Sequence, residues 1–321
     1  MTPRTRIFLL VALAAVVASG VVVVGVLATR TDVPSVEPRT GRPPLALDLG
    51  LRTDPEARAL ARAQELDDKT GRPKSAAEIF ARYPSLEAKV GAAMADWPGG
   101  TVARLETLAA EYPRSALVAL NLGLALYWSR RDAEAAQAWR SAAALEPDSF
   151  YAVRAGDFLH PRLAPGLPTF VPSFREPVRT SVLPPAQRLA ALGRAARGGG
   201  AHAKLLYGAA LQRLSRPRSA EKQFAAAARQ APNDPEARVA AAVGLFDKSN
   251  PSAAFSRLGP LVRVFPRAPT VRFHLGLMLL WLGELHRARD ELRQARAEAP
   301  RSALGREADR YLSALRSVGT P

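Results

Sequence analysis

Cysteine is absent from the 321 residues, and aromatic side chains are scarce. Without a thiol the chain forms no disulfide, holds no Cys-ligated zinc or iron site and has no thiol nucleophile. Aromatic residues are 7% of the chain although 48% is apolar, so burial must come from Ala, Leu and Val. These residues suit closely packed helices better than β-sandwiches. The composition therefore predicts an all-α protein.

Lysine is also rare, with six of the 45 basic residues, so arginine carries the formal net charge of +16. The excess is unevenly placed: residues 1–50 carry +2, 51–157 carry −1, 158–200 carry +5 and 201–321 carry +10. A basic excess is typical of proteins that bind polyanions, but an arginine bias is equally expected from a GC-rich genome. Both interpretations stay open at this point.

The long uncharged run Ile7–Ala28 is preceded by Arg4 and Arg6 and followed by Arg30. A helix of this length spans about 33 Å, enough to cross the hydrocarbon core of a bilayer. We expect a signal-anchor transmembrane helix over 7–28, with a cytoplasmic head at 1–6 and the bulk of the chain on the extracytoplasmic side of the cell membrane. The alternative is a cleaved signal peptide, because small residues suited to cleavage occur at 16–18 and 26–28.

The folded part is expected to start after a Pro-rich stalk at 31–53, and beyond it a 34-residue repeat dominates. The pattern pairs a small residue near the middle of a first helix with an Ala and Leu or aromatic stripe on a second helix, closed by a proline. Three contiguous units run from 201 to 302, and a fourth copy covers 116–149. The repeated positions are Gly208, Ala220, Phe224, Ala227 and Pro232; Ala242, Ala254, Leu258, Leu261 and Pro266; Gly276, Ala288, Leu292, Ala295 and Pro300; and Gly123, Ala135, Trp139, Ala142 and Pro147.

This spacing, met several times in phase, resembles the tetratricopeptide repeat (TPR). The resemblance implies an all-α, TPR-type α-α solenoid, a right-handed superhelix of helix-turn-helix repeats, after one N-terminal transmembrane helix. Because one helix pair cannot bury its own apolar face, such pairs stack into an array. We expect degenerate helical repeats at 54–115, a split repeat at 150–200 and a capping helix and tail at 303–321.

The split repeat contains an insertion at 159–184 with six prolines and two phenylalanines, Phe170 and Phe174. Irregular stretches of this length are unusual inside a compact array. One interpretation is a structural connector that packs its two rings on neighbouring helices; the other is a hinge or a partner-binding loop.

Residue patterns for catalysis or cofactor binding are missing from the sequence. The four histidines, His160, His202, His274 and His286, are scattered and show no metal-ligand spacing. Gly198–Gly200 lacks the Lys and hydroxyl residue of a phosphate-binding loop and is interpreted as a helix end. We therefore expect no enzyme activity, no cofactor and no metal.

The TPR resemblance implies that first helices line a concave groove, which here is apolar. A helix such as 270–281 that is apolar on two faces needs a cover on both. The cover is either the chain itself, through its C-terminal helix or the insertion, or a helix or extended peptide of a partner protein. The candidate partner-binding residues are Leu120, Leu124, Tyr127, Trp128, Phe246, Phe273, Leu277, Leu280 and Trp281.

Most basic residues of the C-terminal repeats fall on second helices, which the resemblance places on the convex side. Such a belt could attract anionic lipid. Nucleic acid is disfavoured as a ligand, because aromatic residues do not interleave the arginines. The candidate basic residues are Arg218, Lys222, Arg229, Arg257, Arg263, Arg289, Arg293 and Arg296.

The sequence thus favours a membrane-anchored TPR protein that serves as a protein-protein interaction scaffold or assembly factor through an apolar groove. The alternative is an exported soluble TPR protein that binds a polyanion or an anionic membrane surface through its basic convex face. A third interpretation is a regulatory TPR module on the cytoplasmic face.

Overall fold

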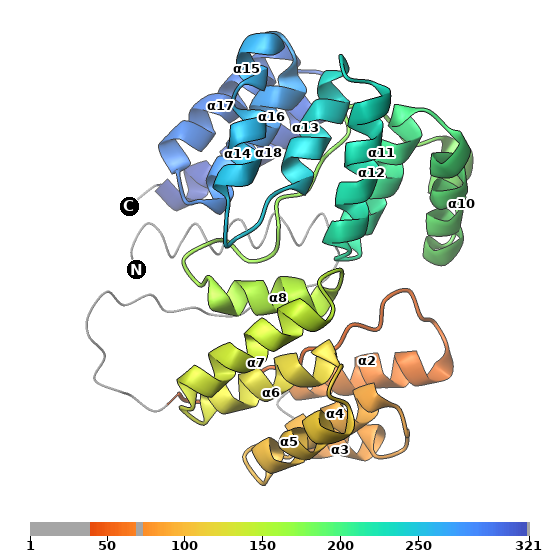
Figure 1. Ribbon diagram of the computed structural model, residues 1–321, viewed down its shortest axis with the longest axis vertical. Helices are drawn as coiled ribbons and strands as arrows, with labels where there is room; N and C mark the ends of the chain where they lie inside the picture. Colours follow the sequence, from red (N-terminus) through yellow and green to blue (C-terminus); the bar gives the residue numbers. More distant parts are fainter. Residues whose placement is uncertain (1–38, 69–72, 320–321) are drawn as a thin grey trace. The chain divides into compact units, whose positions relative to one another are not determined.

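The computed structural model describes residues 39–68 and 73–319, where every regular element is a helix (Figure 1). The predicted head at 1–6 and the predicted anchor at 7–28 lie outside the described residues. Within the described ranges, none of the helices combines the length and the apolar character needed to cross a membrane. The chain divides into two compact units at residue 159/160, and each is considered by itself.

The N-terminal unit contains three helix pairs and a final single helix. In each pair the second helix packs between its own first helix and the next one, while the first helices α2, α4, α6 and α8 also contact each other in turn. The elements are α2 (Pro55–Asp68), α3 (Pro73–Phe80), α4 (Leu86–Ala95), α5 (Thr101–Glu111), α6 (Ala116–Trp128), α7 (Asp132–Leu145) and α8 (Phe150–Leu159).

The C-terminal unit repeats this plan. Helices α11, α13, α16 and α18 are first helices, and α10, α12, α14 with α15, and α17 are second helices. The elements are α9 (Val178–Ser181), α10 (Pro185–Gly198), α11 (Ala201–Arg213), α12 (Pro217–Gln230), α13 (Pro235–Gly244), α14 (Ser252–Leu258), α15 (Leu261–Val264), α16 (Pro269–Trp281), α17 (Leu285–Glu298) and α18 (Ala303–Gly319).

The repeat residues do what their spacing predicts. A Cβ on Gly123 would lie 2.4 Å from the Trp139 ring, and one on Gly208 would lie 2.4 Å from the Phe224 ring. Glycine is required there because the two helices of a pair approach until the ring of the second touches the backbone of the first. Each repeat proline stands two residues after the end of a second helix, where it stops that helix. In the second tandem unit Pro260 also breaks the second helix into α14 and α15.

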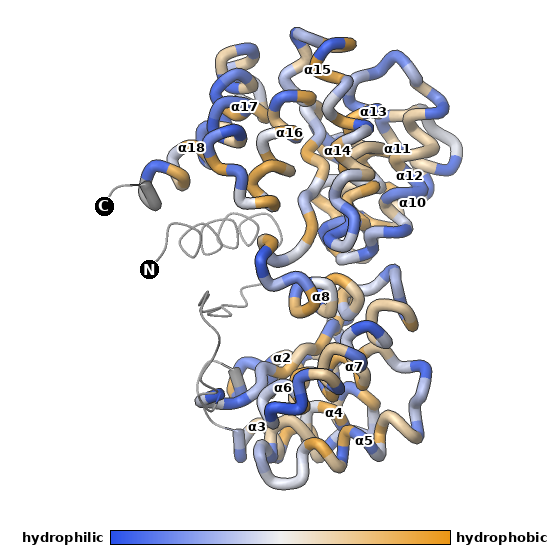
Figure 2. The backbone as a smooth tube through the Cα atoms, turned by 60° about the vertical axis from the view of Figure 1, so that its left-hand side comes forward, coloured by the Kyte–Doolittle hydropathy of each residue, from blue (hydrophilic) through white to orange (hydrophobic). Residues whose placement is uncertain are grey.

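Both units have an apolar core of buried residues from first and second helices. Figure 2 shows hydrophobic positions, in orange, alternating with hydrophilic ones along the helices. Two sequence expectations need correction. The halves of the predicted split repeat fall in different units, because α8 ends the N-terminal unit and α10 begins the C-terminal helices. In addition, the predicted stalk 31–53 is not free over the part that is described, because residues 43 and 45–47 are buried against the N-terminal unit.

Candidate functional site

The first helices of each unit bind an extended stretch of the same chain. In the N-terminal unit this stretch is residues 39–49, called here the leading segment. In the C-terminal unit it is residues 164–174 of the Pro-rich insertion, called here the strap. Neither stretch is helical, and both have their backbone groups bonded by side chains of first helices. The face of the first helices that holds each stretch, called here the inner face, corresponds to the groove predicted from the repeats.

Asn121 of α6 is the central contact of the leading segment. Its side-chain oxygen accepts the N–H of Ala46 at 3.0 Å, and its amide nitrogen donates to the carbonyl of Ala46 at 2.9 Å and to that of Leu117 at 2.9 Å. Asn121 and Ala46 are buried. The pairing satisfies both backbone groups of Ala46 away from water, as a neighbouring β-strand would.

Further contacts place the leading segment across all four first helices. Gln64 of α2 donates to the carbonyl of Leu45 at 3.1 Å, and the N–H of Asp48 donates to the hydroxyl of Tyr151 of α8 at 3.2 Å. Burial raises the pKa of Tyr151, so this hydroxyl stays neutral. Leu45 and Leu47 fill the apolar floor between these polar contacts.

Two arginines hold the beginning of the leading segment. Arg42 donates to the carbonyls of Met94 and Ala95 of α4 and forms an ion pair with Asp67 of α2 at 3.0 Å. Burial raises the pKa of Asp67, and the charge of Arg42 opposes that rise. Arg39 forms an ion pair with Asp132, donates to the carbonyl of Tyr127 and lies over the Tyr127 ring.

The strap is held in the C-terminal unit by the same kind of contact. The N–H of Phe170 donates to the Gln212 side-chain oxygen at 2.8 Å, and the N–H of Val171 donates to Nε2 of His274 at 2.9 Å. The N–H of Ser173 donates to the Glu236 carboxylate at 3.3 Å. Gln212, Glu236 and His274 lie on α11, α13 and α16, so the strap crosses three first helices.

The tautomer of His274 follows from its contacts. Nδ1 lies 2.7 Å from the carbonyl of Thr270 and must carry the proton, which leaves Nε2 as the acceptor for Val171. The ring is fully buried, and this burial lowers the pKa of His274 to about 4. Burial also raises the pKa of Glu236, which faces the strap from α13.

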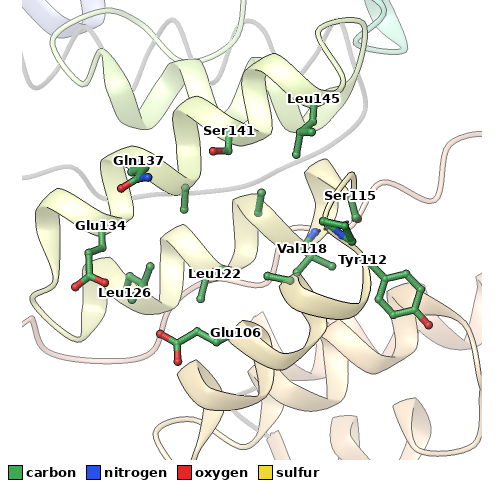
Figure 3. Close-up of a pocket in the computed structure, with 14 residues that line it drawn as sticks. Glu106, Tyr112, Ser115, Val118, Leu122, Leu126, Glu134, Gln137, Ser141 and Leu145 are labelled. Carbon is green, nitrogen blue, oxygen red and sulfur yellow. Dashed lines mark hydrogen bonds between the residues drawn. The ribbon is translucent and has the colours of Figure 1, made fainter.

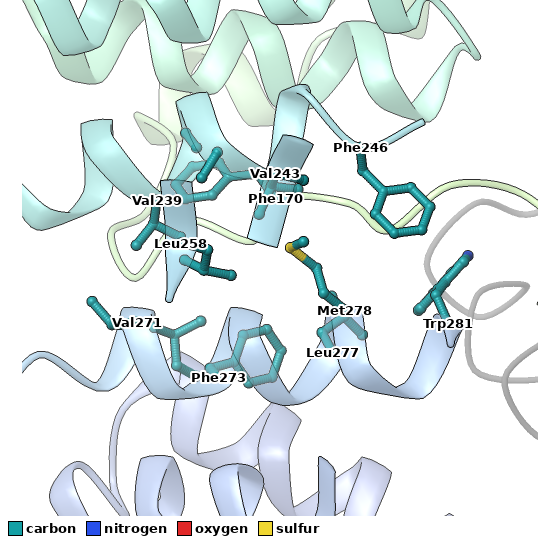
Figure 4. Packing of buried hydrophobic residues seen from close by; sticks show 14 of the residues in the cluster. Phe170, Val239, Val243, Phe246, Leu258, Val271, Phe273, Leu277, Met278 and Trp281 are labelled. Carbon is teal, nitrogen blue, oxygen red and sulfur yellow. The ribbon is translucent and has the colours of Figure 1, made fainter. Parts of the chain in front are cut away.

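The other end of the strap is fixed at the end of α16. The N–H of Ala164 donates to the carbonyl of Trp281, the Trp281 indole N–H donates to the carbonyl of Gly166, and Lys248 Nζ donates to the carbonyl of Ala164 at 2.7 Å. Between the two ends, Phe170 stacks on the His274 ring with centroids 5.0 Å apart. Figure 4 shows Phe170 near Val239 and Val243 of α13, across from α16.

The candidate groove residues are therefore covered by the chain itself. Leu120 and Leu124 share a core with the leading segment, and the aromatic rings of Tyr127 and Trp128 are half-buried beside it. In the C-terminal unit Phe246, Leu277, Leu280 and Trp281 share a core with the strap, and Phe273 also contacts Tyr311 of α18. Of the two covers considered for α16, the chain's own insertion and C-terminal helix are the ones present.

The polar residues that bond the two extended stretches are absent from the candidate groove residues, and Asn121 and His274 are the two that occupy the same repeat position. Asn121 stands two residues before the repeat glycine Gly123, and His274 stands two residues before Gly276. A buried polar residue at the same repeat position in two otherwise apolar helices was the available signal.

The basic residues of the outer helices divide into two groups. Some are paired: Arg218 with Glu221, Arg293 with Asp290, and Arg296 with Asp309, while Arg289 donates to the carbonyl of Leu315. The remaining four candidates are exposed on α12, α14 and α15 and take part in none of the ion pairs found among the described residues. These are Lys222, Arg229, Arg257 and Arg263.

A separate pocket of about 340 Å³ lies among α5, α6 and α7 (Figure 3). Its floor is formed by Val118, Leu122 and Leu126 of α6. Glu106 of α5 and Glu134 of α7 also line the pocket, and both form ion pairs with Arg131. Across the described ranges, His, Asp and Glu residues do not gather in threes as a metal site requires.

The repeat period and the close contact of Gly123 with Trp139 and of Gly208 with Phe224 together define the architecture. The fold is an array of stacked helix pairs whose repeat resembles the tetratricopeptide repeat. No family model matches the chain, and no curated protein matches it.

Comparison with solved structures finds TPR proteins at low sequence identity and low TM-score. YrrB, described as a TPR protein with an unusual peptide-binding site, is 16% identical over 64% of this chain and 97% of its own, with a TM-score of 0.31. The TPR2AB domain of yeast Sti1, solved in complex with pHSP90, is 12% identical over 81% of this chain and 98% of its own, with a TM-score of 0.31. Yeast Tom70 is 12% identical over 86% of this chain and 67% of its own, with a TM-score of 0.32.

Proposed function

We propose that this chain is a membrane-anchored TPR scaffold or assembly factor that binds a protein partner on the inner faces of its two repeat units. The predicted helix 7–28 would hold it in the cell membrane, with residues 31–321 on the extracytoplasmic side. Side chains placed to bond peptide backbone, together with rings packed in an apolar surface, are a means of recognising another chain.

The observation that carries the proposal is the pairing of Asn121 with both backbone groups of Ala46. A side chain that meets an N–H and a carbonyl of one residue recognises extended backbone whatever side chain that residue has. The equivalent position in the C-terminal unit, His274, also accepts a backbone N–H. Both inner faces are therefore suited to an extended polypeptide.

Site-specific photo-cross-linking of the full-length protein in its own membrane tests this proposal. A photoreactive amino acid is placed at Tyr127 or Phe246 on the inner faces, and at the exposed outer residue Arg257 as a matched control. We expect both inner positions to cross-link to segments of one partner protein, identified by mass spectrometry, and the control to miss it. Inner positions that cross-link only to the chain itself, with a partner captured only at Arg257, would overturn the proposal.

A second candidate function is favoured by the four exposed basic residues of α12, α14 and α15. Exposed arginines and lysines near an anionic bilayer each contribute attraction of order 1 kcal/mol. Binding of the protein to vesicles with and without anionic lipid at low salt, compared with a variant carrying Gln at Lys222, Arg229, Arg257 and Arg263, tests it. Equal binding by the two proteins would remove this function.

A further inference from the structure

The strap has the chemistry of a bound peptide. Residues 163–174 contain no charged side chain, although Arg162 and Arg175 flank them. Four of its backbone N–H groups and two of its carbonyls are bonded by the rest of the unit, and one large side chain, Phe170, is buried at 2% exposure. Backbone bonding combined with one buried aromatic side chain is how extended peptides are recognised.

The inner face under the strap is suited to exposure as well as to burial. Glu236, Lys248 and His274 are buried where the strap lies on them, and each bonds a backbone group of the strap. When the strap leaves, water can solvate these three groups, which a purely apolar core would not allow. These three polar groups therefore lower the free-energy cost of removing the strap. When the face is covered, they require an occupant that forms hydrogen bonds with them.

The strap can also leave without unfolding the array. Residues 160–177 contain no helix, so none of the helices from α10 to α18 has to unwind when the strap moves. Beyond the strap, Val178 at the start of α9 and Val182 just after it are 77% and 73% exposed. This stretch is held instead by the ion pair of Glu176 with Arg188 and by Phe174 stacked on the ring of His202. Release of the strap breaks these contacts, its backbone hydrogen bonds and the packing of Phe170, but it melts no helix, and local openings of this kind require less free energy than global unfolding.

The leading segment is a second example of an extended stretch bound on an inner face. A second extended stretch, unrelated to the strap in sequence, lies on the inner face of the other unit and is bonded from the same repeat position. Two inner faces that each hold an extended stretch indicate that extended-chain binding is a property of this kind of face.

We propose that the strap is the resident occupant of the C-terminal inner face, and that a partner displaces it with an extended, uncharged segment carrying a phenylalanine in the place of Phe170. This inference rests on the proposed function and specifies the partner segment. A charged segment is disfavoured because the floor already holds a buried carboxylate and a buried ammonium, each engaged by backbone.

A labelled synthetic peptide with the sequence of residues 163–175 is the probe, added to the purified full-length protein in detergent. In the wild-type protein the strap competes at the high effective concentration of a tethered ligand, so peptide binding is weak. Phe170→Ala weakens the strap and leaves the inner face unchanged. We expect this variant to bind the peptide about tenfold more tightly, because the available fraction of the site rises. Phe255→Ala, a truncation on the outer helix α14, is the matched control and should bind like wild type.

Hydrogen exchange of the wild-type protein supplies a readout that does not depend on any variant. We expect the amides of Phe170, Val171 and Ser173 to exchange through local opening, faster than those of α16, and to exchange faster still when the peptide is added. Exchange of the strap only with global unfolding, or equal peptide affinity of folded Phe170→Ala and Phe255→Ala proteins, would overturn the proposal. That outcome would make the strap a permanent part of the core, while a scaffold acting through the N-terminal unit would still be tested by cross-linking at Tyr127.

Discussion

Replacement of Asn121 by leucine is the sharpest test of how the leading segment is held. The side chain is fully buried and satisfies the N–H and the carbonyl of Ala46 at 3.0 and 2.9 Å. Leucine has a similar volume, so the change removes the hydrogen bonds without opening a large cavity. The effect of the substitution therefore reports mainly on the polar contacts.

The magnitude follows from the groups left behind. The two lost hydrogen bonds to Ala46 cost about 1 kcal/mol each, and its two backbone groups left buried without partners cost about 1 to 2 kcal/mol each. The third lost bond, to Leu117, adds little because that carbonyl also accepts the helical N–H of residue 121. The apolar side chain returns about 1 to 2 kcal/mol by its own burial. We expect the N-terminal unit to lose about 3 kcal/mol. If the leading segment detaches so that water can reach these groups, the loss is limited to the cost of exposing Leu45 and Leu47.

Hydrogen exchange with peptide-level resolution distinguishes the two units in one experiment. Peptides covering 39–49 should lose most of their protection in Asn121→Leu, while peptides of α16 serve as an internal standard. Gln137→Leu, the same change of side-chain class at an exposed position on α7, should alter stability by about 0.5 kcal/mol or less. If protection at 39–49 is unchanged in Asn121→Leu, the leading segment does not depend on the amide pairing and the reasoning fails.

Two further outcomes follow from burial and close packing. The pKa of His274 is about 4 in the folded unit and about 6.5 in an unfolded chain, so the unfolded state binds more protons in between and the C-terminal unit should lose about 3 kcal/mol as pH falls from 6.5 to 4. His274→Gln keeps an acceptor for Val171 and removes the titrating group. The free energy of unfolding of this variant, measured by urea denaturation, should therefore change less between pH 7 and pH 4 than that of the wild type. An equal change in both proteins would refute the lowered pKa of His274. Gly123→Ala should destabilise the N-terminal unit by about 1 to 3 kcal/mol because its Cβ meets the Trp139 ring. Gly156→Ala, at a helical position with open space around it, should instead stabilise the N-terminal unit by about 0.5 to 1 kcal/mol. Thermal denaturation of both variants and the wild type measures the two effects.

The helical architecture was predictable because each helix pair repeats the same local problem. A glycine facing a ring, an apolar stripe with helical spacing and a closing proline specify a pair without reference to distant residues. The degenerate region was predictable only in outline: helical repeats are expected over 54–115, and helices α2 to α5 lie in that range. The break at Pro260 changed one second helix without changing which residues it buries.

The occupants of the inner faces were not predictable in this way. The leading segment and the strap are extended and rich in proline, and a stretch without periodicity carries no indication of the surface it will cover. Asn121 and His274 could have been noted as polar residues at equivalent positions. Their role became clear only when Ala46 and Val171, 75 and 103 residues away in sequence, were found against them.

The sequence by itself therefore determined an all-α repeat protein with a basic C-terminal half, because helix pairing and composition depend on residues close together in the chain. Tertiary structure alone decided that both inner faces are closed by the chain's own extended segments. The physical reason is that a backbone N–H or carbonyl is the same in every residue, so a contact made through the backbone leaves no signature in the sequence of the segment that is bound.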